Sequence, residues 1–257
     1  MSDWRCDHYD YGLEVIKGGI PGTAHAGGFG EQSISGATDN IDIWGGPTNV
    51  QPEPATGGYA LWVESSDDLD GKTGAPSSTG ARTVDIHYLD TNGAEQSTGS
   101  VTLNGTTPVD TGVTDCMFVQ EHHVVTVGSG LVAAGDIDIT KTSGGVVVSR
   151  VSAAGNQSMS TMWQVPANKT LYVTSWSGEG TAATTKIANL RIRTSTHDDA
   201  INAGVYHFRG SARVKDSPTG TLPVWFTVPA LATVKISGWT TGTIDVTARW
   251  TGYLVDD

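Results

Sequence analysis

The feature that most constrains the fold of this chain is an alternation of apolar and polar side chains with a period of two. The clearest example covers residues 81–107, where Val84 and Ile86 alternate with polar neighbours. This period is typical of a strand with one buried face. The strand runs into Asp-Thr-Asn-Gly at residues 90–93, where Asn and Gly tolerate the positive φ of a tight turn. The pattern predicts an antiparallel hairpin over residues 81–107, without a set of residues typical of catalysis.

The same pattern recurs along most of the chain after residue 58. Strand-like runs separated by turn signals occur at residues 58–65, 116–127, 135–142, 145–151, 159–165, 170–176, 187–194, 204–214, 222–228, 232–237 and 242–255. Many short strands joined by turns predict an all-β domain over residues 59–257, an antiparallel β-sandwich with a jelly-roll-like arrangement. No run suits a helix of three turns, although residues 195–203 suit a single turn.

Two further expectations concern turns and tryptophans. The turn Pro-Ala-Asn-Lys at residues 166–169 is expected to join its flanking runs into a second hairpin, and Val-Pro-Ala recurs at residues 228–230 as a repeated turn. Tryptophans within or at the ends of the predicted strands are assigned to core and inter-sheet packing, with an aromatic platform for carbohydrate as the alternative. They are Trp62, Trp163, Trp176, Trp225, Trp239 and Trp250.

Residues 1–58 differ from the rest of the chain because neither a helical nor a strand period persists there. They combine Gly- and Pro-rich clusters, such as Gly-Gly-Ile-Pro-Gly at residues 18–22, with scattered large apolar side chains. Large apolar residues in an irregular segment need a surface to cover. We therefore expect residues 1–58 to form an extended, irregular N-terminal arm that packs on its own domain or on neighbouring subunits. The predicted interface anchors are Trp4, Tyr9, Tyr11, Ile16, Phe29 and Trp44.

Charge and composition limit the classes of partner. The chain has a formal net charge of −12. Such a surface repels phosphate backbones and anionic membranes, so we expect no nucleic-acid partner and no membrane partner. No segment approaches the ~18 apolar residues of a membrane span, and the N-terminus lacks the apolar core of a signal peptide. The sequence thus predicts synthesis in the cytoplasm, with Cys6 and Cys116 as free thiols.

Few residue patterns suggest chemistry. Asp67, Asp68 and Asp70 resemble half of a calcium loop, but the closing acid is missing, so a solvated acidic loop is favoured over a cation site. His122 and His123 are neighbours on a predicted strand and point to opposite faces, which argues against a shared metal ion. No P-loop, dinucleotide fingerprint, GxSxG or HExxH motif is present. The sequence therefore predicts a protein that is not an enzyme and needs no cofactor.

Several short motifs occur together along the chain. They are LEV at 13–15, GGIPG at 18–22, DIWGG at 42–46, ARTV at 81–84, TLNGTTPV at 102–109, GNQSM at 155–159, VPANKT at 165–170 and LVDD at 254–257. With these motifs in this order, nearly the whole chain resembles a family of structural proteins of tailed bacteriophages that is frequent in marine phages. The resemblance implies a non-enzymatic virion component that is assembled in the host cytoplasm.

The resemblance leaves the position in the virion open. The first hypothesis is a capsid cement or decoration protein, a homotrimer that binds the major capsid protein and stabilises the shell through its arm and β-domain. The alternative is a tail-associated or receptor-binding β-sandwich protein, with a cell-surface glycan as partner. A non-viral carbohydrate-binding module is the third hypothesis. Open strand edges and an apolar arm favour burial against copies of the same chain, so we expect a closed homo-oligomer.

Overall fold

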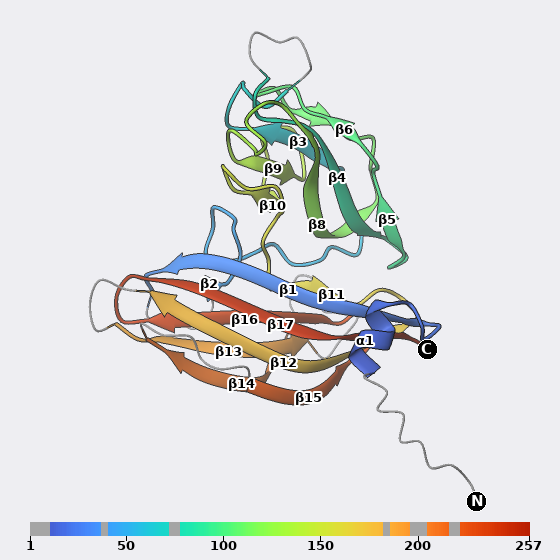
Figure 1. The fold of residues 1–257 in the computed structure, drawn as a ribbon, viewed down its shortest axis with the longest axis vertical. Helices are drawn as coiled ribbons and strands as arrows, with labels where there is room; N and C mark the ends of the chain where they lie inside the picture. The colour runs from blue at the N-terminus through green and yellow to red at the C-terminus, as the bar shows by residue number, and fades with distance from the viewer. Residues whose placement is uncertain (1–10, 37–40, 72–77, 182–185, 196–204, 216–221) are drawn as a thin grey trace, which may run out of the picture.

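The computed structural model describes residues 11–36, 41–71, 78–181, 186–195, 205–215 and 222–257, and nearly all its regular structure is β-strand (Figure 1). The one helix in these residues, α1, spans Tyr11–Ile16. The strands are β1 (Thr23–Ile34), β2 (Ile41–Asp42), β3 (Trp62–Ser65), β4 (Ala81–Asp90), β5 (Glu95–Ser97), β6 (Val101–Thr102), β7 (Val109–Asp110), β8 (Cys116–Val127), β9 (Ile137–Thr140), β10 (Val147–Val151), β11 (Trp163–Gln164), β12 (Lys169–Thr181), β13 (Ala188–Ser195), β14 (Tyr206–Val214), β15 (Leu222–Val228), β16 (Thr233–Thr240) and β17 (Ile244–Asp256). The predicted all-β antiparallel sandwich is confirmed. Within the described ranges, no helix has the length and apolar character needed to cross a membrane.

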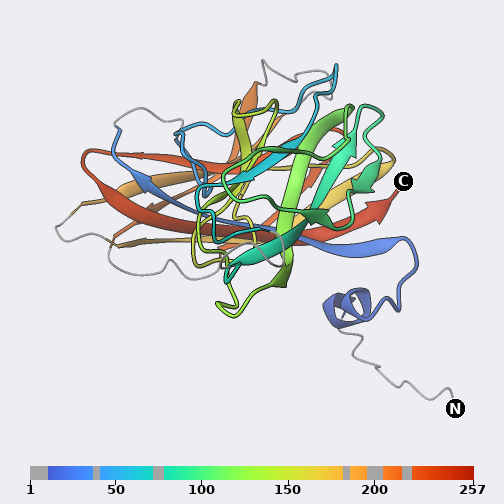
Figure 2. The same cartoon turned by 90° about the horizontal axis from the view of Figure 1, so that it is seen from above.

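The strands form two lobes, each with its own buried apolar cluster (Figure 1). Seen from above, one lobe lies in front of the other (Figure 2). The sandwich lobe contains β1, β2 and β11 to β17. The inserted lobe contains β3 to β10 and lies between β2 and β11 in the sequence. The chain therefore leaves the sandwich after β2, builds the inserted lobe and returns to complete the sandwich.

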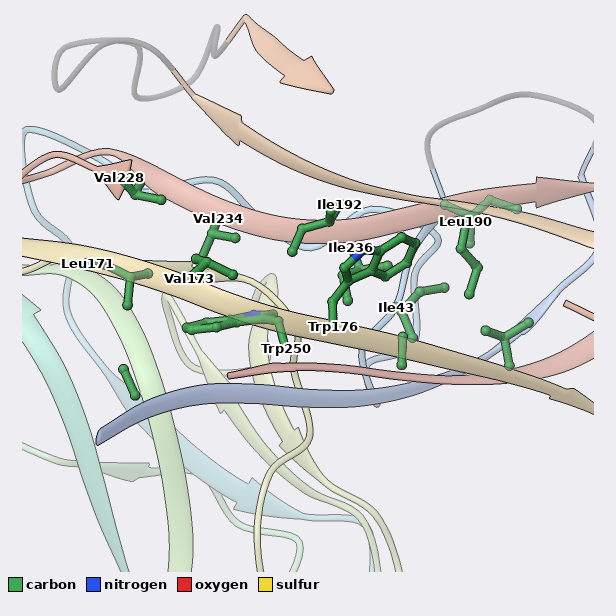
Figure 3. Close-up of a cluster of buried hydrophobic side chains, with 14 of the residues drawn as sticks. Ile43, Leu171, Val173, Trp176, Leu190, Ile192, Val228, Val234, Ile236 and Trp250 are labelled. Carbon is green, nitrogen blue, oxygen red and sulfur yellow. The ribbon is translucent and has the colours of Figure 1, made fainter. Parts of the chain in front are cut away.

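The sandwich lobe packs two antiparallel sheets face to face. One sheet has the order β1-β17-β12-β15 and the other has the order β11-β16-β13-β14, with β2 added beside β16. Side chains of alternate residues meet between the sheets, as Trp176, Ile192, Ile236 and Trp250 do in Figure 3. The indole N–H of Trp250 donates to the carbonyl oxygen of Thr161 at 2.8 Å, so this large ring is buried without an unpaired donor. The period of two seen in the sequence is the direct cause of this core.

The inserted lobe combines two smaller sheets around a second core. One sheet has the order β10-β9-β3-β7, and the other joins β5, β4, β6 and β8. The predicted hairpin over residues 81–107 is confirmed, because β4 pairs with both β5 and β6 in antiparallel register. Gly93 has a φ of 75° in the turn, and the carbonyl of Asp90 accepts the Gly93 N–H at 2.8 Å. The Asn-Gly dipeptide therefore predicts the position of this turn correctly.

The N-terminal segment departs from the predicted irregular arm. Residues 23–34 form β1, which pairs with β17 along its whole length, and the helix α1 precedes it. The glycines that suggested irregular structure instead allow close packing. A Cβ on Gly28 would lie 2.6 Å from the indole nitrogen of Trp250, and one on Gly30 would collide with the carbonyl oxygen of Ile43. The close approach of Trp250 and Ile43, rather than a turn, therefore requires glycine at these two positions of β1.

The buried clusters also divide the chain differently from the predicted boundary at residue 58. Ile34, Ile41 and Ile43 belong to the same cluster as the residues of β12 to β17. Residues 61–151 contribute a separate cluster. Among the described residues, those before residue 58 therefore do not form an arm separate from the domain, because β1 and β2 complete the sheets of the sandwich.

The predicted second hairpin over residues 159–176 is wrong. β11 pairs with β16 in one sheet, whereas β12 pairs with β15 and β17 in the other. The turn between β11 and β12 has Asn168 at a φ of 60°, and the related turn between β15 and β16 has Leu231 at 61°. The two turns are neighbours, because the Leu231 N–H donates to the carbonyl of Val165 at 2.8 Å. The repeated Val-Pro-Ala-X sequence therefore carries the chain from one sheet to the other.

Candidate functional site

The predicted arm anchors lie in different environments. Trp4 and Tyr9 are outside the described residues, and Tyr11 is the first residue of α1. Ile16 at the end of α1 is 68% exposed, and Phe29 on the outer face of β1 is 48% exposed. Ile16 and Phe29 therefore offer apolar surface to a partner.

Trp44 differs from these anchors because it is a core residue. Its side chain is 1% exposed, and its indole N–H donates to the carbonyl oxygen of Thr48 at 2.8 Å. The ring lies against Gly46, where any Cβ would collide with it. Contrary to the prediction, Trp44 packs within its own chain and offers no surface to a partner.

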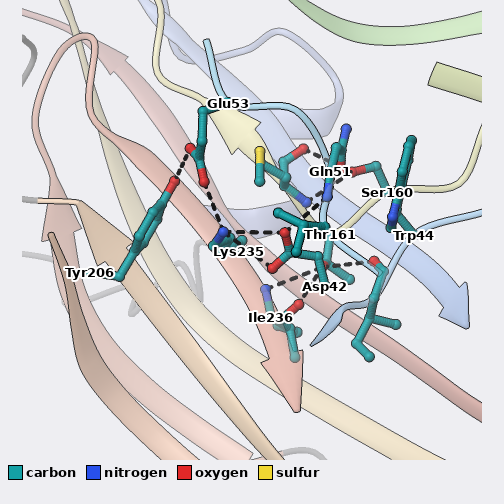
Figure 4. Close-up of polar contacts among 12 residues, drawn as sticks. Asp42, Trp44, Gln51, Glu53, Ser160, Thr161, Tyr206, Lys235 and Ile236 are labelled. Atoms are coloured by element: carbon teal, nitrogen blue, oxygen red, sulfur yellow. Dashed lines mark hydrogen bonds and ion pairs between the residues drawn. The ribbon is translucent and has the colours of Figure 1, made fainter. Parts of the chain in front are cut away.

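A buried polar network holds residues 42–53, which link the two lobes, against the sandwich (Figure 4). The ammonium of Lys235 on β16 lies 3.2 Å from the Asp42 carboxylate and 2.9 Å from Oε1 of Glu53. The Tyr206 hydroxyl on β14 donates to Glu53, and the backbone N–H of Gln51 donates to Asp42 at 3.1 Å. Burial raises the pKa of Asp42 to about 6, since the Lys235 charge offsets only part of the desolvation. The network positions residues 42–53, from which the chain enters the inserted lobe.

The sandwich has an open edge on the side away from the inserted lobe (Figure 1). Among the described strands, β14 and β15 each lie at the end of a sheet. The Arg209 guanidinium is 5.8 Å from the centroid of the Phe226 ring, so the two edge strands are neighbours. Trp225 on β15 is 82% exposed, and Phe208 on β14 is 56% exposed. We call Phe208, Arg209, Arg213 and Trp225, which all lie on these two edge strands, the open-edge surface. Trp225 points outward from one sheet, whereas Phe208 contacts Arg191 on the outer face of the other sheet. Exposed aromatic rings thus flank both strand edges, which is typical of a protein–protein interface.

The open-edge surface is basic although the chain as a whole is acidic. β13 and β14 contain Arg191, Arg193, Arg209 and Arg213 and no acidic residue. The guanidinium of Arg191 lies 4.2 Å from the Phe208 ring centroid, which places a cation on the exposed aromatic face. Residues 59–160, by contrast, hold 12 of the 27 acidic residues and only 4 of the 15 basic ones. Opposite charges at two ends of the molecule favour head-to-tail contacts between copies.

The prediction that Trp225 packs in the core is wrong, because its side chain is 82% exposed. Val224, Phe226 and Val228 turn toward the sandwich, so the intervening Trp225 points outward. The period of two within Leu-Pro-Val-Trp-Phe-Thr-Val was the signal that could have found it. For Trp176 and Trp250 the core assignment is confirmed, because they are 2% and 1% exposed.

The acidic loop predicted at Asp67, Asp68 and Asp70 uses its carboxylates within the fold. Asp67 accepts the Leu69 N–H at 2.8 Å, and Asp68 accepts the Thr106 hydroxyl at 2.8 Å. Asp70 is completely buried, contrary to the prediction of a solvated loop. Its carboxylate accepts backbone N–H groups from residues 81, 134 and 135 and the Ser65 hydroxyl. These hydrogen bonds explain the acid at position 70 without a cation.

Replacing Asp70 with asparagine is expected to lower the free energy of unfolding by about 2 kcal/mol, because an amide NH₂ would face a buried N–H donor. Urea unfolding followed by tryptophan fluorescence measures the change. Asp68→Asn is the matched control, with an expected change of less than about 0.5 kcal/mol, since the exposed amide oxygen still accepts from Thr106. Equal losses in the two variants would contradict the assigned role of Asp70.

The two adjacent histidines point to opposite faces of β8, as predicted. His122 is fully buried, and its ring lies 2.9 Å from the Ser149 hydroxyl. Burial lowers the pKa of His122 to about 3, so this ring is neutral at physiological pH. His123 lies on the other face, opposite Asp85 of β4.

Of the two cysteines predicted to be free thiols, Cys116 lies among the described residues. Cys116 is a buried free cysteine at the start of β8. Burial raises its pKa to about 12, which keeps the thiol protonated and unreactive. Cys6 lies outside the described residues.

A groove of about 720 Å³ separates the two lobes. Its sandwich side is formed by β1 and β17 with Phe29 and Arg249, and its other side includes Glu121 and Gln157 of the inserted lobe. Trp163 also lines the groove and packs edge-on against Trp250, with ring centroids 6.1 Å apart. Aromatic rings combined with amide, carboxylate and guanidinium groups suit a polar ligand with apolar faces.

Comparison with known proteins identifies no family for the chain. No family model matches it, and no curated protein matches it significantly. Among solved structures, it is similar to the structure of infectious bursal disease virus Gx strain, with 10% identity, a TM-score of 0.22 and coverage of 90% of this chain and 75% of that chain. It is also similar to the infectious bursal disease virus VP2 subviral particle, with 8% identity, a TM-score of 0.21 and coverage of 92% and 73%. Likenesses this weak carry no argument about function.

Proposed function

We propose that the protein is a non-enzymatic structural component of a tailed-bacteriophage virion, and that it acts as a capsid cement or decoration protein. The observation that carries this proposal is the open-edge surface, where Trp225 and Phe208 are exposed beside two strand edges. Such a surface suits repeated protein contacts better than the binding of a small substrate. The motif resemblance along the chain supplies the virion context.

The proposed assembly is a closed homotrimer. The basic open-edge surface of one copy contacts the acidic inserted lobe of the next, a head-to-tail interface that closes into a ring. Ile16, at the end of α1, and Phe29, which lines the groove between the lobes, are left to contact the major capsid protein. Burying one such large apolar side chain contributes about 1.5–3 kcal/mol, so a few of them are enough for firm attachment.

The paired substitution Trp225→Ala with Phe208→Ala is expected to convert the trimer into a monomer, because it removes the exposed rings from the interface. Analytical ultracentrifugation of the intact chain at micromolar concentration measures the change. Phe29→Ala is the matched control, since Phe29 is 48% exposed on β1, at the end of the sheet opposite to β15. The assembly model fails if the wild-type chain sediments as a monomer or the paired variant stays trimeric.

Attachment to the virion is tested separately with particles that lack the protein. We expect the wild-type chain to bind these particles at regular positions on the shell, as seen by electron cryomicroscopy. Phe29→Ala together with Ile16→Ala is expected to reduce occupancy while leaving the trimer intact. Wild-type chain found on the tail, or on no part of the particle, would contradict the decoration role.

The groove between the lobes favours a second candidate, a tail-associated protein that binds a cell-surface glycan. Trp163 and Phe29 offer aromatic faces, and Gln157 and Arg249 offer hydrogen-bonding groups along the same groove. Binding of host-derived glycans that is lost in Trp163→Ala, with a correctly folded variant, would support this candidate over decoration of the shell.

A further inference from the structure

Three side chains of the inserted lobe converge on one face of the β4–β8 pair. Asp85 and His87 are two residues apart on β4 and therefore share a face, and His123 on β8 lies directly opposite Asp85. One ligand atom from each of the three lies within 4.8 Å of the others. Oδ2 of Asp85 is 3.3 Å from Nε2 of His87, and the centroids of the two imidazole rings are 5.5 Å apart.

We propose that Asp85, His87 and His123 form a binding site for a divalent transition-metal ion of the Zn²⁺ type. Two imidazole nitrogens and one carboxylate oxygen are a ligand set that zinc and its neighbours in the first transition row accept. Three protein ligands leave coordination positions open for water. The sequence argues against a metal site because the adjacent His122 and His123 point to opposite faces of one strand. The proposed site instead takes its ligands from two paired strands, β4 and β8.

Neighbouring hydroxyl groups hold the carboxylate in position for this role. The Ser97 hydroxyl donates to Oδ1 of Asp85 at 2.7 Å, and the Thr98 hydroxyl donates to the same oxygen at 3.3 Å. Oδ2 is thereby directed toward His87. Hydrogen bonds that orient a ligating carboxylate from outside the coordination sphere are a regular feature of metal sites.

The site is accessible, and its occupation would act on the fold. The side chain of His87 is 42% exposed and that of Asp85 is 17% exposed, so an ion from solvent can reach both. A bound ion would link β4 to β8 and would bind the folded chain in preference to the unfolded one. The midpoint of thermal unfolding is therefore expected to rise with metal concentration.

The test is calorimetric titration of Zn²⁺ into tag-free, chelator-treated chain. We expect one ion per chain, and we expect His123→Ala and His87→Ala each to weaken binding at least about tenfold. Ser97→Ala is expected to weaken it by about tenfold, because Asp85 loses one orienting hydrogen bond. His207→Ala is the matched control, since it removes an exposed strand histidine outside the site and is expected to bind like the wild type.

Two further readouts separate a built site from surface adsorption. Co²⁺ absorption in the visible range is expected to report nitrogen and oxygen ligands in the wild type and to be lost in His123→Ala. Circular dichroism verifies that each variant is folded, and Asp85→Asn replaces any variant that is not. Wild-type chain without stoichiometric Zn²⁺, or wild-type affinity in folded His123→Ala, would overturn the proposal.

Discussion

Substitution of Lys235 by methionine is expected to lower the free energy of unfolding by about 3–5 kcal/mol at pH 8, because it leaves the buried Asp42 carboxylate and the partly buried Glu53 carboxylate without their cation. The Lys235 side chain is 8% exposed, and it pairs with Asp42, which is 2% exposed, and with Glu53. Methionine has a similar length and creates little empty space, so the loss reports the missing charge rather than a cavity. Urea unfolding monitored by tryptophan fluorescence measures it.

The loss caused by Lys235→Met is expected to depend on pH. Asp42 has a pKa raised from 3.8 to about 6, so its contribution favours the folded state below pH 4 and is lost as the pH rises through 6. Without the ammonium the pKa of Asp42 rises further, and protonation relieves the buried charge at pH 5. The variant is therefore expected to recover part of its lost stability between pH 8 and pH 5, relative to the wild type at the same pH.

The neutral, buried His122 makes stability depend on pH with the opposite sign. This contribution is the same in Lys235→Met and in the wild type. Its pKa is lowered to about 3, so its contribution to stability is present above pH 6.5 and is lost as the pH falls through 3. Comparison of variant and wild type at each pH removes this effect.

Lys169→Met is the control for Lys235→Met, because Lys169 forms more exposed ion pairs with Glu95 and Asp256 and is expected to contribute less than about 1 kcal/mol. A pH-independent loss in Lys235→Met would contradict the assigned electrostatic role.

Trp250→Ala is expected to lower the free energy of unfolding by about 3–5 kcal/mol, the cost typical of a large aromatic residue removed from a core. The ring is 1% exposed, packs against Trp163 and fills the space left by Gly28. Its removal also leaves the carbonyl of Thr161 without its indole donor. Chemical unfolding monitored by circular dichroism gives the value independently of tryptophan emission.

Trp225→Ala is the matched control for Trp250→Ala. It is the same substitution, but Trp225 is 82% exposed, so the expected change in the free energy of unfolding of the monomer is within about 0.5 kcal/mol. Measurement at a protein concentration at which both the variant and the wild type sediment as monomers removes the stabilising effect of assembly. A large loss under these conditions would show that Trp225 contributes to the fold and would weaken its assignment to the open-edge surface.

Local alternation was sufficient to predict the strands and many of their buried faces. In β17, Val246, Ala248 and Trp250 follow the expected period and lie in the core. The hairpin over residues 81–107 was equally accessible, because the Asn-Gly turn and the flanking strands are local features. The same period, applied to residue 225, would also have placed that tryptophan outside.

Glycine-rich β1 shows where local reasoning was misleading. The glycines of β1 suggest turns or irregular structure when only the sequence is considered. In the structure, the lack of a side chain at Gly28 and Gly30 leaves room for the Trp250 ring and for the backbone of Ile43. The residues that require glycine at these positions lie far along the chain or in another strand. The repeated Val-Pro-Ala turn is similar, since its sequence suits a tight connection whether the next strand pairs in the same sheet or in the opposite one.

The sequence by itself determined the strand class, the turn positions and the alternation of faces, because each depends on neighbours within a few residues. Only the tertiary structure decided which strands pair and which polar groups meet. Lys235 contacts Asp42 across 193 positions, and His123 of β8 joins Asp85 and His87 of β4. Long-range pairing and its register follow from the combined packing of two sheets and two cores, which no short segment encodes.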